Sequence, residues 1–135
     1  MSIHLERKDL VNVQQMEVAV NGPDGATHLI LCHGVADLGA VSEEIYTFFV
    51  GPQLSRRQFV GAIASGALSK IEAHGDKNVG GTGESELGVN LISVAADYDE
   101  EHHQVRVKAE VAPGAALLTL AISYNVSILA ELSCY

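Results

Sequence analysis

The sequence predicts an α+β fold: a mainly antiparallel β-sheet of about five strands, in the order ββααβββ, with two helices inserted after the second strand. Two observations predict it. Several segments alternate apolar and polar residues, as half-buried strands do, and short connections rich in Gly, Pro, Asn and Asp join them. After the second such segment, apolar residues recur at helical spacing. We expect residues 1–135 to form a single domain, because the chain has the usual length of one.

The first two strands are predicted as a hairpin. The segment Leu10 to Val20 is rich in Val and leads into Asn21-Gly-Pro-Asp-Gly25, a run of turn-forming residues. Thr27 to His33 is then the returning strand, because so short a connection reverses the chain but cannot form a parallel crossover.

The first helix is predicted to begin at Ser42, a residue type that caps helix N-termini, and to stop at Gly51-Pro52. Ile45, Phe48 and Phe49 would form its apolar stripe.

The second helix is predicted to begin at Ser55, which has capping-box spacing to Gln58. Apolar residues then repeat every four positions, at Phe59, Ile63, Ala67 and Ile71. Glycines at 61 and 66 weaken a helix, and therefore indicate close approach of another backbone.

The rest of the chain is predicted to be β-structure. Residues 76–88 are expected to form a mobile glycine-rich loop. Three strands follow: Val89 to Tyr98, Gln104 to Val111, and a long one from Ala115 to Leu132 after a Pro113-Gly114 turn. The last carries no charge up to Ala130, but its two-residue alternation of large apolar and small polar residues favours a strand over a membrane-spanning helix.

The charge balance excludes some partners. Eight Lys and Arg residues against 17 Asp and Glu residues give a formal charge of −9, so we expect binding neither to nucleic acid nor to a membrane. The two cysteines form no disulfide framework, and the N-terminal residues lack the order of a secretory signal. We therefore expect a cytoplasmic protein.

One short motif resembles a known signal. Ser55-Arg56-Arg57-Gln58-Phe59-Val60 resembles the core of the twin-arginine export signal, but it lies well inside the chain rather than near its start. The motif is better interpreted as a capped helix start whose arginines reach an acidic neighbour on a partner.

No pattern indicates catalysis, a metal or a cofactor. Cys32 and His33 are adjacent on a predicted strand, so their side chains should diverge, and Cys32 is expected to be a buried structural residue. The segment Asp97 to His103 is rich in possible metal ligands but is interpreted as a solvated hairpin turn. The glycine-rich loop lacks the Gly-Lys-Ser/Thr sequence of a phosphate-binding loop.

The leading functional hypothesis is a non-enzymatic assembly or interaction module that forms a homo-oligomer or a subunit of a larger complex. The small-residue helix and the long last strand motivate it, and the candidate contact residues are Gly61, Ser65, Gly66, Ser127 and Leu129. The alternative is a small-molecule-binding protein or enzyme with a pocket between the sheet and the helices. Its candidate lining residues are His28, Cys32, Tyr124 and Asn125.

Overall fold

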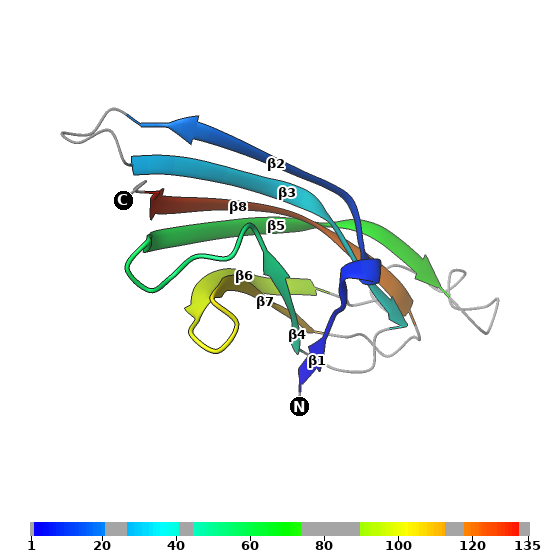
Figure 1. Ribbon diagram of the computed structural model, residues 1–135. Coiled ribbons are helices and arrows are strands. Elements are labelled where there is room, and N and C mark those ends of the chain that lie inside the picture. The colour runs from blue at the N-terminus through cyan, green and yellow to red at the C-terminus, as the bar shows by residue number, and fades with distance from the viewer. Residues whose placement is uncertain (1, 21–26, 41–44, 74–89, 113–117, 133–135) are drawn as a thin grey trace.

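The strands form two sheets that lie one above the other (Figure 1). The structure, a computed structural model, describes residues 2–20, 27–40, 45–73, 90–112 and 118–132. The short sheet contains, in spatial order, β1 (Ser2–His4), β4 (Ile45–Val50), β7 (Gln104–Ala112) and β6 (Asn90–Asp99). The long sheet contains β2 (Leu10–Ala19), β3 (Thr27–Ala40), β8 (Leu118–Glu131) and β5 (Phe59–Ala73). A 3₁₀ turn, η1 (Arg7–Asp9), connects β1 to β2.

The predicted α+β class and its two inserted helices are wrong. Among the described residues, η1 is the only helical element, and both segments assigned to helices are strands. The protein is a β-sandwich with four strands in each sheet.

The first helix prediction failed at β4. Ile-Tyr-Thr-Phe-Phe-Val consists entirely of β-branched and aromatic residues, which favour strands. Burial alternates along it, so Tyr46, Phe48 and Val50 point into the core while the residues between them are half-buried. Ile45, Phe48 and Phe49 looked like a helical stripe only because Tyr46 and Val50 were left out of the pattern.

The second helix prediction failed at β5 because a four-residue repeat is also compatible with a strand. Positions four apart lie on one face of a strand as well as on one face of a helix. Ile63 is 72% exposed, whereas Ala62 and Ala64 on the other face pack against the core. The small residues suit β5 because they allow it to approach the short sheet closely.

The capping signal before β5 does form its hydrogen bonds. The Ser55 N–H donates to Oε1 of Gln58 at 2.8 Å, and the Gln58 N–H donates to Oγ of Ser55 at 3.3 Å. These bonds close a single turn, after which the chain becomes extended at Phe59. The motif thus marks a turn and not the start of a helix.

The predicted hairpins and later strands are confirmed. β2 pairs antiparallel with β3, and β6 pairs antiparallel with β7. β8 lies between β3 and β5 and pairs antiparallel with both. The turn at residues 21–25, the glycine-rich loop at 76–88 and the Pro113-Gly114 turn lie outside the described residues.

The core fills the space between the sheets. Its largest fully buried side chains come from both layers and include Tyr46, Tyr124, Phe48, Ile30, Ile122 and Val107. The Phe48 and Tyr124 rings, one from each sheet, lie 4.9 Å apart between centroids. This contact joins the two layers near their middle.

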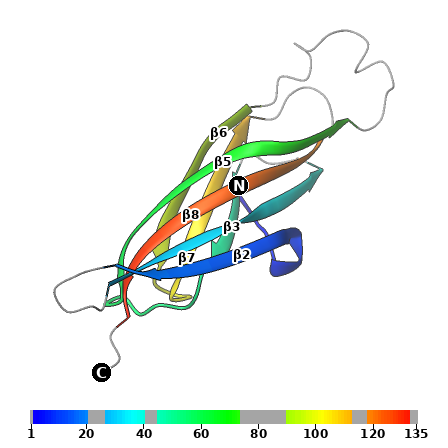
Figure 2. The same cartoon turned by 90° about the horizontal axis from the view of Figure 1, so that it is seen from above.

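The two long sides of the sandwich differ. On one side β5 lies over β6, and the backbone of Gly66 comes close to the side chain of Val94 (Figures 1 and 2). On the other side, β2 is the edge of the long sheet, and its residues after Leu10 are all exposed. The sandwich is therefore closed along β5 and β6 and open beneath β2.

Candidate functional site

The outer face of the long sheet, meaning the side chains that point away from the short sheet, is largely apolar at one end. Strand register aligns Val18, Leu29, Leu129 and Gly61 in one row across the sheet. The next row is Met16, Leu31, Ser127 and Ile63. We call Met16, Val18, Leu29, Leu31, Ile63 and Leu129 the apolar patch. Ile63 is 72% exposed, Met16 62% and Val18 42%.

No charged side chain interrupts this face for two further rows. These rows are Gln14, His33, Asn125 and Ser65, followed by Val11, Val35, Ser123 and Ala67. The outer face of the short sheet has the opposite character, because Asp97, Arg106 and Lys108 are exposed there. A chain with a formal charge of −9 therefore keeps one whole sheet face almost free of charge.

Four of the five predicted contact residues lie on this outer face. Ser127 and Leu129 come from β8, and register places Gly61 opposite Leu129 on β5 and Ser65 opposite Asn125. Gly66 instead faces the interior, where a Cβ atom would lie 2.9 Å from Cγ2 of Val94. Sequence reasoning missed Met16, Leu31 and Ile63, the last because it was assigned to a helix stripe.

The four predicted ligand-lining residues do not form one site. Asn125 is exposed on the outer face, whereas His28, Cys32 and Tyr124 lie on the inner side of the long sheet. His28 is near the end of β2, with its Nδ1 atom 3.8 Å from Oε2 of Glu17, too far for a hydrogen bond. Cys32 and Tyr124 remain close to each other.

Cys32 and Tyr124 line a groove of about 1010 Å³ beneath β2, at the open side of the sandwich. The predicted pocket between the sheet and two helices is wrong because those helices do not exist. The groove lies between the two sheets instead, and residues of β1, η1 and β4 form its opposite wall. Sequence reasoning missed the groove residues Arg7, Gln15 and Gln104, because nothing in their spacing indicates that they meet.

The Cys32 thiol is not suited to nucleophilic chemistry. It is a free cysteine, 4% exposed, and burial raises its pKa from 9.0 to about 11. The thiol therefore stays protonated at neutral pH. Burial, and then the neighbouring Cys32, also raise the pKa of Tyr124.

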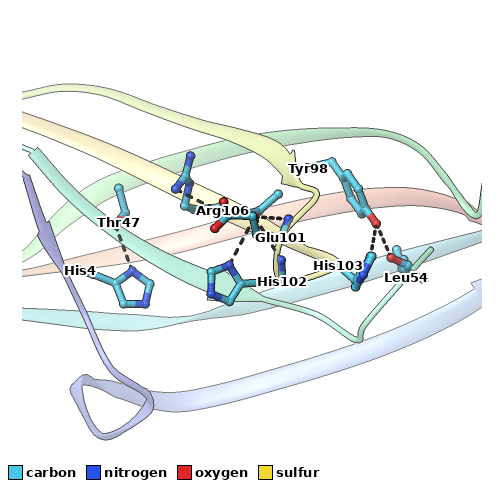
Figure 3. Close-up of polar contacts among 9 residues, drawn as sticks. His4, Thr47, Leu54, Tyr98, Glu101, His102, His103 and Arg106 are labelled. Atoms are coloured by element: carbon cyan, nitrogen blue, oxygen red, sulfur yellow. Dashed lines mark hydrogen bonds and ion pairs between the residues drawn. The ribbon is translucent and has the colours of Figure 1, made fainter. Parts of the chain in front are cut away.

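The acidic neighbour of the paired arginines belongs to the same chain. Nε of Arg56 lies 3.5 Å from Oε1 of Glu100, and the Arg56 guanidinium lies 5.6 Å from the centre of the Tyr98 ring. The Tyr98 hydroxyl donates to the carbonyl of Leu54 at 2.6 Å and contacts Nδ1 of His103 at 3.2 Å (Figure 3). Together these contacts fasten the turn before β5 to the β6–β7 hairpin.

The acid- and histidine-rich segment forms that hairpin turn. Asp99 accepts the backbone N–H groups of Glu101 at 2.9 Å and His102 at 3.2 Å, and its carboxylate lies 3.4 Å from Nη1 of Arg106 (Figure 3). Within the part of the chain that the structure describes, no three His, Cys, Asp or Glu side chains converge as metal ligands. The carboxylate of Asp99 is thus occupied by the turn itself.

Comparisons with known proteins add no function to this geometry. No protein-family model matches the chain, and neither the curated proteins nor the solved structures contain a match. In the described ranges, no helix has the length and apolar character needed to cross a membrane.

Proposed function

We propose that this chain is a non-enzymatic assembly module, and that it forms a homo-oligomer by packing the outer face of its long sheet against that of a second copy. The observation that carries the proposal is the apolar patch, in which Met16 and Ile63 are mostly exposed. Contiguous exposed apolar surface on a soluble protein typically marks an interaction site. Isolated exposed apolar residues would not support the proposal, but these side chains occupy adjacent rows of one sheet.

Charge favours a second copy as the partner. Two chains that each carry a formal charge of −9 repel one another unless their acidic residues stay away from the contact. The four central rows of the outer face hold no Lys, Arg, Asp or Glu. Stacking two such faces buries apolar area without desolvating a charge.

The shape of β5 also suits a two-fold contact. Gly61 and Ile63 lie two residues apart on the same face, and no atom lies within 4 Å of a Cβ built on Gly61. A protruding Ile63 side chain of one copy can therefore occupy the space above Gly61 of the other. A two-fold axis makes this contact twice, as expected for an isologous interface.

A cytoplasmic location remains part of the proposal. Cys32 is a buried free thiol, and such cysteines fit a reducing compartment.

The test is the oligomeric state of charge variants on the two sheet faces. We expect the wild-type chain to sediment as a dimer or higher oligomer, and Ile63→Glu and Met16→Glu to sediment as folded monomers, because each places like charges opposite each other. Ile92→Glu is the matched control, since Ile92 is 57% exposed on β6 of the short sheet. Analytical ultracentrifugation over a concentration series measures the mass, and circular dichroism checks folding. A wild-type monomer at every concentration, or equal dissociation by Ile92→Glu, would refute the proposal.

A further inference from the structure

The groove beneath β2 is a second unusual feature and lies on the opposite side of the long sheet from the apolar patch. Its floor is made of core side chains: Leu5, Cys32, Val50 and Tyr124 are 6%, 4%, 5% and 1% exposed. These residues end the core at the open side of the sandwich. A cavity of about 1010 Å³ lies over them, at the upper end of the size usual for small-molecule sites.

Neutral amides surround this apolar floor. Gln14 and Gln15 of β2 lie on one wall, and Gln53 and Gln104 lie on the other. Nε2 of Gln104 donates to the carbonyl of Gly51 at 2.6 Å, which holds that amide at the groove. An amide can donate and accept hydrogen bonds, so this rim suits a polar group of either kind.

The charge available at the mouth of the groove is positive. Glu6 and Arg7 both line it, and both are exposed. Glu6 lies 3.7 Å from Nζ of Lys8, whereas Arg7 forms no ion pair with any residue that the structure describes. An unpaired guanidinium beside a groove favours a carboxylate, which it can bind through two parallel hydrogen bonds.

We propose that the groove binds an amphipathic carboxylic acid, a small molecule whose apolar body lies on the Cys32–Tyr124 floor and whose carboxylate pairs with Arg7. An apolar floor with few polar groups at its rim is the usual arrangement of a small-molecule site. The proposal does not depend on self-association, because neither Arg7 nor the groove floor belongs to the outer face.

The test uses decanoate as the probe, with decanol as the uncharged analogue of equal chain length. Isothermal titration calorimetry should show one decanoate bound per chain, and native mass spectrometry should show the same stoichiometry. Arg7→Gln should weaken decanoate binding about tenfold or more and change decanol binding little, because it removes a charged hydrogen-bond donor. Lys8→Gln is the matched control, since Lys8 is the adjacent exposed cation and does not line the groove.

A second readout locates the ligand. In a Cys134→Ser background, Cys32 is the remaining thiol, and bound decanoate should slow its reaction with iodoacetamide. The slowing should be lost in Arg7→Gln at the same decanoate concentration and kept in Lys8→Gln. The proposal is overturned if decanoate does not bind, binds in many equivalents, binds no better than decanol, or is unaffected by Arg7→Gln.

Discussion

Gly66 of β5 lies so close to Val94 of β6 that a Cβ atom at position 66 would be 2.9 Å from Cγ2 of Val94. The same atom would be 3.0 Å from the carbonyl oxygen of Ser123, which belongs to the backbone of β8 and cannot rotate away. The closed side of the sandwich therefore depends on the absence of a side chain at this position.

We predict that Gly66→Ala lowers the free energy of unfolding by about 1–3 kcal/mol, because the added methyl group overpacks the contact between the sheets. Gly61→Ala is the matched control on the same strand. It has open space and should be neutral or stabilising by up to about 0.5 kcal/mol, because alanine restricts the unfolded chain. Urea denaturation measures both changes. Equal effects of the two variants would contradict the tight packing at Gly66.

We predict that Tyr98→Phe destabilises the protein by about 1–2 kcal/mol, since it leaves the carbonyl of buried Leu54 without its hydrogen-bond donor. The substitution keeps the aromatic ring, which stacks on Phe59 at 5.1 Å between centroids. A chemical-denaturation curve gives the loss, and a change in the imidazole resonances of His103 should accompany it. Unchanged stability would mean that water replaces the hydroxyl at no cost.

The carboxyl of Asp99 should make stability depend on acid pH. Desolvation raises its pKa, but the His102 backbone and side chain and the Glu101 N–H together lower it below the ordinary 3.8. In acid the unfolded chain therefore takes up this proton first, so the stabilisation is complete above about pH 3.8 and declines as the pH falls through the lower folded-state value.

The variant that tests this linkage is Asp99→Asn, compared with wild type by thermal unfolding at a series of pH values. We expect wild type to be the more stable near neutrality and the difference to shrink below pH 3.8. Glu101→Gln serves as the control in the same turn. A difference between wild type and Asp99→Asn that does not change with pH would contradict the prediction.

Cys32 should cause the opposite dependence in alkali. Its pKa is raised to about 11, so above the ordinary value of 9.0 the folded protein holds a proton that the unfolded chain has lost. The free energy of unfolding then falls as pH rises, by at most about 1.4 kcal/mol per pH unit for this group. Cys32→Val should flatten the decline between pH 9 and 10, where the raised pKa of Tyr124 has little effect. An equally steep decline in the variant would assign the effect to another group.

Local chemistry was readable from the sequence where it acts over a few residues. The first hairpin was predicted from the Val-rich segment at Leu10–Val20 and the returning strand at Thr27, and both strands are present. The reciprocal bonds of Ser55 and Gln58 also form as their spacing indicated. Packing across the sandwich decides whether the chain beyond such a turn becomes helix or strand, and that is why the same signal was extended into a helix that does not exist.

The candidate face and groove could be predicted only in part. Alternation along β8 places Ser127 and Leu129 together on one face, as expected, but β-bulges shift the alternation elsewhere. Register slips between Val11 and Gln14 in β2, and between Phe59 and Gly61 in β5, so sequence parity alone assigns the faces wrongly. The groove depends on which strands become edges, because Arg7 and Gln104 are far apart in the sequence.

The position of β8 has a consequence for synthesis of the protein. β8 comes after every other strand in the chain, yet it lies in the interior of the long sheet, hydrogen-bonded to β3 on one side and β5 on the other. Each nascent chain therefore passes through a stage in which β3 and β5 have been translated but the strand that joins them has not. Completion of the long sheet must wait for pairings between residues distant in sequence, which form slowly and leave strand edges open to wrong partners in the meantime.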